Sequence, residues 1–180
     1  LSERVSMLRG RACPVRVRRL PLAVEVPHPS PAPLAWQKSP IDRVPPGRAL
    51  LGRVYGFDGA RDLALPLASS TGCHLLISAM AGGGKSKLIR GAVSSLVLNN
   101  SPADLRLVLV DLKRSALAPF GSLPHVETFA ADNESATKAI AAVAASIRAR
   151  RDSGGIGPRV VLVVDELREV VAGDSATLAP

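Results

Sequence analysis

One stretch of this sequence, Ala79-Met80-Ala81-Gly82-Gly83-Gly84-Lys85-Ser86, has the pattern of a phosphate-binding loop (P-loop), with Ala in place of the usual first Gly. Glycines let the backbone curl so that consecutive N–H groups point at phosphates. In this pattern Lys85 reaches the β- and γ-phosphates and Ser86 offers its hydroxyl to Mg²⁺. A glycine-rich turn that binds no nucleotide is the alternative, and the strand and helix expected around the loop argue against it.

Short apolar segments predict the strands of a sheet. Runs of five or six apolar residues suit strands that are buried on both faces of a parallel sheet, and they are too short for buried helices. We expect these strands at His74–Ser78, Leu105–Val110 and Val160–Val164. The first of them leads directly into the P-loop.

Two amphipathic segments predict helices between these strands. One has its apolar face from Leu88 to Val97 and ends at Asn99 and Asn100. The other has its apolar face from Ala136 to Ile147, with Asp132 or Asn133 as its N-cap. Alternating strands and helices around a P-loop predict an α/β fold, a RecA-like P-loop NTPase with a mostly parallel central sheet.

An acidic pair follows the last predicted strand. Asp165 and Glu166 come directly after the run Val160–Val164. Such a pair is common alone, but about 80 residues after a P-loop it indicates a metal-binding strand. We expect Asp165 to hold Mg²⁺, mostly through water, and Glu166 to act as the general base that polarises the attacking water. A Glu after the Asp favours an ATPase over a kinase.

A second strand ends in polar residues at the same expected edge of the sheet. Asp111 and Lys113 follow Leu107–Val110. From spacing alone, an ordinary strand-to-loop transition is the simpler interpretation. We keep both residues as candidates for nucleotide sensing.

The charge is concentrated in the first third of the chain. Residues 1–61 hold 11 Lys and Arg against 4 Asp and Glu, a net +7, and residues 62–180 hold 12 against 11, a net +1, which together give +8. A basic region favours an anionic partner such as nucleic acid or a membrane surface, and a merely solvated basic segment is the alternative. The aromatic content of 3% argues against binding single strands by base stacking.

Composition and cysteine usage exclude several classes of protein. The apolar fraction of 47% is that of a folded domain. The longest apolar runs fall far short of the roughly 20 residues that cross a bilayer, so we expect no membrane segment in this chain. Cys13 and Cys73 are too few for a disulfide framework, which favours a reducing compartment, the cytoplasm. Membrane association through parts outside this chain is left open.

The chain is expected to have two parts. Residues 1–46 predict a small basic subdomain with strands around Val15–Arg18 and Leu22–Val26, followed by a proline-rich connection with seven prolines at positions 27–46. Residues 47–180 predict the P-loop ATPase core.

Several of these segments together resemble one family. From about Leu51 to Val171 the chain resembles the motor domain of the FtsK/SpoIIIE DNA translocases. The segments that carry this resemblance are Cys73–Ala79, Asp111-Leu112-Lys113, Leu123-Pro124-His125 and Val163–Glu166. The basic segment before the core resembles the small strand-rich subdomain that precedes this motor.

The resemblance implies a ring, usually hexameric, that hydrolyses ATP with Mg²⁺ and threads double-stranded DNA through its centre without reading its sequence. It implies nucleotide binding by Ala81–Lys87, with Lys85 and Glu166 catalytic and Ser86 and Asp165 at the metal. The chain departs from the family at Leu112, where Pro is usual, and at Ala116 and near Ser146, where Glu is usual. The family's motor also continues well past the acidic pair, so we expect the core to be truncated at its C-terminal end.

Two other functions compete with DNA translocation. Ring ATPases of type VII secretion systems have similar motifs and move protein substrates, and the basic N-terminal third favours DNA over protein. A chain without the last third of the motor is also compatible with a nucleotide-binding or assembly module that does not hydrolyse ATP.

Overall fold

The computed structural model describes six stretches of the chain, namely residues 16–19, 22–25, 44–56, 59–67, 74–154 and 157–177. The chain divides into two compact units, Leu1–Ala35 and Trp36–Pro180. In the first unit, β1 (Arg16–Arg19) and β2 (Leu22–Glu25) pair in antiparallel fashion, close to where two strands are predicted. Most of the proline-rich connection and both cysteines lie outside the described residues.

The second unit contains a three-stranded parallel sheet. Its order is β6 (Val126–Ala130), β5 (Leu105–Asp111), β7 (Arg159–Asp165), and β5 pairs in parallel with both neighbours. This sheet confirms the predicted α/β fold class. The register places Asp111 of β5 opposite Asp165 of β7, so two carboxylates meet at one edge of the sheet.

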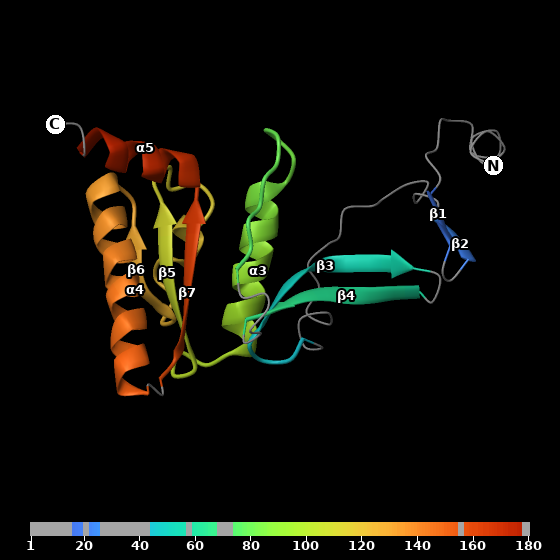
Figure 1. Cartoon of the computed structure of the whole chain (residues 1–180), viewed down its shortest axis with the longest axis horizontal. Coiled ribbons are helices and arrows are strands. Elements are labelled where there is room, and N and C mark those ends of the chain that lie inside the picture. The colour runs from blue at the N-terminus through green and yellow to red at the C-terminus, as the bar shows by residue number, and fades with distance from the viewer. Residues whose placement is uncertain are drawn as a thin grey trace. The chain divides into compact units, whose positions relative to one another are not determined.

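Helices cover the sheet on both faces (Figure 1). Because side chains alternate between the faces of a strand, β5 contributes to two cores. On one face Leu107 and Leu109 pack with α3 (Lys85–Asn99), and on the other Val108 and Val110 pack with α4 (Asn133–Ser153). The short 3-10 helix η1 (Ala118–Phe120) follows β5, and α5 (Leu167–Thr177) follows β7. Within the described ranges, no helix is long and apolar enough to cross a membrane.

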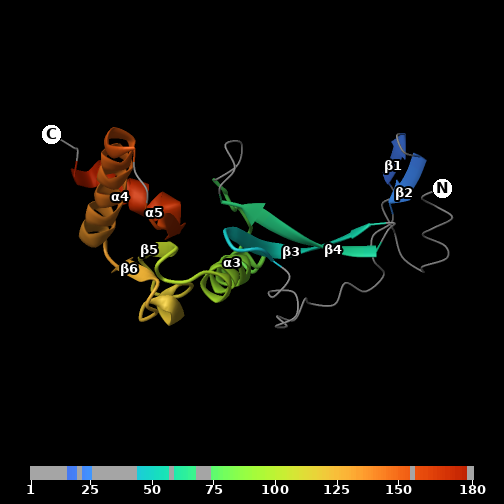
Figure 2. The same cartoon turned by 90° about the horizontal axis from the view of Figure 1, so that it is seen from below.

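A β-hairpin packs beside α3 (Figure 2). It consists of β3 (Arg48–Gly56) and β4 (Gly59–Pro66), paired in antiparallel fashion. The backbone N–H of Leu50 donates to the Ser95 hydroxyl at 2.8 Å, which ties the hairpin to the buried side of α3. This hairpin is absent from the elements predicted above, although Asp58-Gly59 between two strand-like segments is a hairpin signal.

The predicted strand His74–Ser78 is wrong for this structure. Residues 74–80 form neither helix nor strand, and two of their side chains are largely exposed, Leu76 at 82% and Met80 at 88%. A strand needs a neighbour for its backbone hydrogen bonds, and none of the described strands pairs with this segment. Its apolar composition alone therefore predicted the wrong local structure.

Both predicted helices are present. α3 ends at Asn99, and its C-cap residue Asn100 has an extended backbone. α4 is capped by Asp132, one of the two residues expected there, and ends at Ser153, followed by the C-cap residue Gly154 in the left-handed conformation common after helices. Both helices extend a few residues beyond the predicted apolar faces.

Candidate functional site

The P-loop forms a tight turn directly before α3. The backbone N–H of Gly83 donates to the carbonyl of Met80 at 2.9 Å. A Cβ at position 83 would lie 2.9 Å from that same carbonyl oxygen, so only glycine fits there. Gly84 has φ 89°, in the left-handed region that favours glycine. The glycines predicted from the motif are thus needed for the shape of this loop.

The start of α3 is open to an anion. Gly84 is the N-cap residue, no side chain caps the helix, and its first turn has no acidic residue. The first N–H groups of a helix have no partner within the helix, and they favour negative charge. Of the predicted nucleotide-binding residues, Lys85 and Ser86 are half-buried here, and Ala81, Gly82 and Lys87 are exposed nearby.

Two buried carboxylates lie beside this helix start. Asp111 is 0% exposed and Asp165 is 2% exposed, and they end neighbouring strands. Lys85 Nζ is 2.8 Å from Asp165 Oδ1 and 2.8 Å from Glu166 Oε1. The fold therefore brings together Lys85 and the acidic pair, which lie about 80 residues apart in the sequence.

The ion pairs of Lys85 shift the pKa values of Lys85 and Glu166 in the directions that favour their charged forms. Hydrogen bonding to Asp165 and to Glu166 raises the pKa of Lys85 above its ordinary value. Hydrogen bonding to Lys85 lowers the pKa of Glu166. Glu166 also has φ 56°, which is uncommon for a residue other than glycine and is typical of strained functional positions. The Glu166 carboxylate is thus held ionised, as a general base requires.

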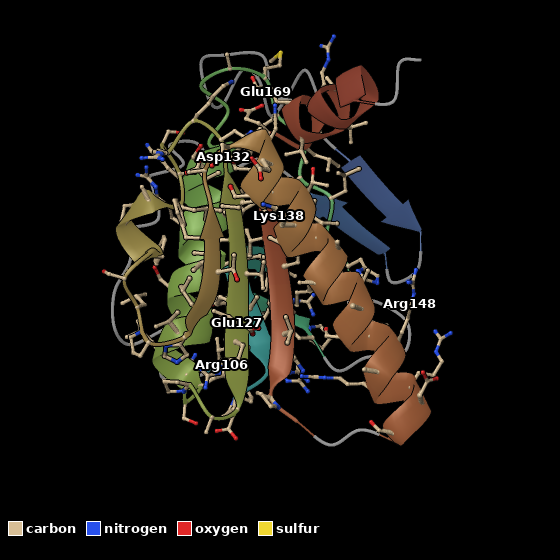
Figure 3. The ribbon with its side chains drawn as sticks, turned by 90° about the vertical axis from the view of Figure 1, so that its left-hand side faces the viewer. Arg106, Glu127, Asp132, Lys138, Arg148 and Glu169 are labelled. Atoms are coloured by element: carbon tan, nitrogen blue, oxygen red, sulfur yellow. The ribbon has the colours of Figure 1, made fainter. Side chains whose placement is uncertain are left out.

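Lys113 and Glu169 extend this charge network. Lys113 Nζ is 2.8 Å from Glu169 Oε1 and 3.9 Å from Glu166 Oε1. The bond to Glu169 raises the pKa of Lys113. Glu169 lies in the first turn of α5, and Figure 3 shows it at the same end of the molecule as Asp132. Glu169 is not among the site residues predicted from the sequence, although its position three residues after Glu166 at a helix start was a usable signal.

Asp111 shapes the loop that carries Lys113. Its Oδ2 accepts hydrogen bonds from the backbone N–H groups of Ala116 and Leu117, at 2.9 and 2.8 Å. From α3, Arg90 Nε donates to the carbonyl of Ala116 at 2.9 Å. The P-loop helix is therefore bonded directly to the loop after β5, and the sequence patterns did not predict this connection through Arg90.

The oxygen atoms of this site fit Mg²⁺. The metal prefers hard oxygen ligands and keeps several waters, so a hydroxyl and one or two carboxylates suffice beside phosphate oxygens. Ser86 lies in the first turn of α3, and Asp165 is buried and pairs with Lys85, the residue before Ser86. Asp111 Oδ1 is buried without a hydrogen-bond partner in the described structure. In the described stretches, no cluster of three or more His, Cys, Asp or Glu side chains offers a metal site built of protein ligands alone.

Comparison with known proteins identifies similar sequences. Residues 43–154 match the model of the FtsK/SpoIIIE family. The chain is 34% identical over 116 residues to the DNA translocase FtsK of Chlamydia trachomatis, covering 59% of this chain and 13% of that protein. It is 44% identical over 95 residues to the ESX-5 secretion system protein EccC5 of Mycobacterium marinum, covering 49% of this chain and 7% of that protein. The chain thus spans a small part of the length of each relative.

Solved structures with a similar fold come from a secretion ATPase. The cytoplasmic domain of the Thermomonospora curvata type VII secretion ATPase EccC matches with a TM-score of 0.55 at 18% identity, over 84% of this chain and 20% of that one. ATPases 2 and 3 of the same protein, in complex with a signal sequence peptide, match with a TM-score of 0.53 at 21% identity, over 69% of this chain and 24% of that one. At this identity the likeness concerns the fold, and it agrees with the predicted P-loop architecture.

Proposed function

Because the chain belongs to the FtsK/SpoIIIE family of P-loop ATPases, we propose that it hydrolyses ATP with Mg²⁺ and couples hydrolysis to the movement of double-stranded DNA. The observation that carries the hydrolytic part is the convergence of Lys85, Asp165 and Glu166 at the open start of α3. These residues supply a phosphate-binding cation, a metal-side carboxylate and a base within contact of one another.

Lys85 links nucleotide binding to the release of the base. Without a phosphate, Lys85 pairs with both Asp165 and Glu166. The β- and γ-phosphates compete for Lys85, and its transfer to them frees the Glu166 carboxylate to accept a proton from the attacking water. Bound Mg²⁺, held by Ser86 and Asp165, would neutralise charge that develops on the phosphates.

Lys113 and Glu169 position Glu166 after Lys85 has left. Lys113 lies 3.9 Å from Glu166 Oε1 and is held by Glu169 at 2.8 Å. A cation at this distance keeps the base ionised without bonding to it tightly. In this role Lys113 senses the nucleotide indirectly, because its environment changes when Lys85 moves. Asp111 supports Lys113 because its side chain accepts hydrogen bonds from the loop after β5, which carries Lys113.

The charge distribution favours DNA as the substrate. Residues 1–61 carry a net +7, and contacts between cationic side chains and phosphates bind duplex DNA without regard to sequence. The relative from C. trachomatis is a DNA translocase. On this proposal the chain works in the cytoplasm as one subunit of a ring, hexameric as the family resemblance implies.

A protein substrate is the second candidate. The relative with 44% identity is a secretion system protein, and one of the similar structures holds a signal sequence peptide. A chain of the same fold that binds nucleotide without turnover is the third.

Steady-state ATP hydrolysis tests these candidates. The rate is measured with and without linear double-stranded DNA, at low and moderate salt, with Glu166→Gln as the inactive variant and Glu134→Gln as a matched control on α4. We expect DNA to stimulate hydrolysis, the stimulation to fall with salt, and Glu166→Gln to lose about a hundredfold or more.

Three other outcomes would contradict the proposal. Hydrolysis that ignores DNA and responds to a signal sequence peptide would support a secretion ATPase. Nucleotide binding without turnover would support a binding or assembly module. Full activity in Glu166→Gln would remove Glu166 from the mechanism. Size-exclusion chromatography separates a ring from a monomer, because their masses differ several-fold.

A further inference from the structure

A cavity of about 670 Å³ lies at the end of the sheet opposite the P-loop. Its lining includes Asp104, which precedes β5, and Arg159, the first residue of β7, whereas the other ends of these strands carry Asp111 and Asp165, and Asp165 pairs with Lys85. Sites for small organic ligands span about 300–1,000 Å³. We propose that this cavity binds a small organic phosphate the size of a mononucleotide, at a site separate from the P-loop.

Two arginines of this cavity have no partner within the described structure. The side chains of Arg150, near the end of α4, and Arg159 are half-buried and make neither an ion pair nor a hydrogen bond with any described residue. Guanidinium groups bind phosphate oxygens through paired N–H donors. Two such groups in one cavity are complementary to a phosphate group with two negative charges.

Glycine backbones allow the two guanidinium groups to lie where they do. A Cβ at Gly47 would be 2.6 Å from Arg159 Nη1, and one at Gly157 would be 3.4 Å from Arg150 Nη2. A larger residue at position 47 would displace the end of the Arg159 side chain, whereas one at position 157 would only contact Arg150. Glycine at position 47 therefore leaves room for the Arg159 guanidinium beside the cavity.

The other polar groups of the lining are already satisfied. Ser101 Oγ donates to Asp104 Oδ2 at 2.6 Å, so the one acid of the lining has a partner. The Asn100 side chain accepts from the N–H of Gly47 and donates to the carbonyl of Leu96. The two arginines are therefore the groups that remain for a ligand, and they outweigh the single carboxylate in charge.

One wall of the cavity is apolar. Val143 and Ile147 on α4, with Val160 on β7, line the cavity beside the arginines. Ile147 is 55% exposed, so its side chain is open to a ligand. A sugar or base packed on this wall would bury apolar surface that inorganic phosphate cannot cover. This wall is the reason for proposing an organic phosphate.

Binding of AMP to the Lys85→Ala chain tests the proposal, because this variant weakens the P-loop and AMP lacks the β- and γ-phosphates. Calorimetry gives the affinity, and ¹H–¹⁵N NMR locates the site through the amides of Gly47, Gly157 and Arg159. We expect saturable binding, shifts at these amides, and affinity weaker by about tenfold or more in Arg150→Gln and in Arg159→Gln.

Arg148→Gln is the matched control, since Arg148 is on the same helix, is exposed and is not part of the cavity lining (Figure 3). It should bind AMP like the Lys85→Ala parent. Absence of saturable binding, amide shifts elsewhere, or an equal loss in Arg148→Gln would overturn the proposal. Inorganic phosphate that binds as tightly as AMP would overturn its organic part. If an arginine variant unfolds, as circular dichroism would show, the NMR shifts in the parent still decide.

Discussion

The two long helices of the core, α3 and α4, pack on opposite faces of the same sheet but begin in different ways. α4 starts with a capping box in which the Asp132 side chain accepts from the N–H of Ser135 at 2.8 Å, and Glu134 adds an acid in the first turn. α3 starts at Gly84 with no side-chain cap and no acid in its first turn. The start of α4 thus bonds one of its N–H groups to its own cap, whereas the start of α3 has no side-chain cap.

On our proposal, one helix start serves stability and the other serves nucleotide binding. A side-chain cap stabilises a helix start, so α3 forgoes stability that α4 has. The lysine near the start of each helix differs in the same way. Lys85 in α3 is bonded to acids of β7 and its loop, which a phosphate can displace, whereas Lys138 in α4 is bonded to Glu134 of its own helix. We therefore propose that the uncapped, acid-free start of α3 beside Lys85 binds the nucleotide.

Among the tests of this comparison, the largest effect is expected when α3 is made to resemble α4. Gly84→Asp would place a carboxylate at the α3 N-cap, where Asp132 stands in α4. The added negative charge would repel phosphate, and φ 89° is unfavourable for the new side chain, so we expect nucleotide affinity to fall by at least about tenfold. Calorimetry with ADP and Mg²⁺ measures it.

Gly84→Asn is the control for this prediction. Asn tolerates the left-handed conformation about as well as Asp and brings no charge. It should lose less affinity than Gly84→Asp. Equal losses in both variants would mean that loop shape, and not an uncharged helix start, governs binding.

A smaller effect is expected from Glu169. Glu169→Gln releases Lys113 from its 2.8 Å ion pair, so Lys113 no longer stands at a fixed distance from Glu166. The side chains of Lys113 and Glu169 are about half exposed, so the ion pair is weak. We therefore expect kcat to fall by about two- to fivefold while the KM for ATP stays close to that of the unmodified chain. Steady-state kinetics measure both constants.

Two further variants show whether Glu169 acts by position. Glu169→Asp should recover part of the lost kcat, and Glu134→Gln, which removes an exposed ion pair within α4, should change neither constant. A rise in KM with unchanged kcat would show that Glu169 serves nucleotide binding instead of positioning the base.

How far the sequence predicts this molecule depends on the kind of signal each residue gives. The P-loop, the acidic pair and the Asp132 cap are local patterns, and the structure places them at the start of α3, the end of β7 and the start of α4, although the strand expected before the P-loop is absent. The strand at 74–78 was predicted from apolar composition, which says nothing about whether a partner strand lies alongside. Ion pairs such as Lys113–Glu169 join residues 56 positions apart, so only the parallel register of β5 and β7 brings them together.

The cap of α4 is expected to affect stability and not function. Asp132→Ala removes the acceptor for the Ser135 N–H, so we expect Tm to fall by about 2–4 °C with ATP hydrolysis unchanged below that temperature. Asp152→Ala removes the same charge near the other end of α4 and should leave Tm unchanged or slightly higher, because an acid near a helix C-terminus is unfavourable. Loss of activity in Asp132→Ala would break the separation between the two helices.

The smallest effect is the pH dependence of this cap. Hydrogen bonds from Ser135 lower the pKa of Asp132 below its ordinary value of 3.8. A carboxylate with a lowered pKa in the folded state stabilises fully above the unfolded value, and its contribution is lost as pH falls through the folded value. Asp132→Asn keeps an N-cap acceptor that does not titrate. We therefore expect the Tm of the unmodified chain to fall more steeply than that of Asp132→Asn below about pH 4, because only the former loses a charged cap at the positive end of α4. Thermal scans of both chains between about pH 2 and pH 7 compare them directly, since every other carboxylate titrates in both. Parallel curves over this range would show that the charge of Asp132 contributes nothing to the cap, and that α4 is held by hydrogen-bond geometry alone.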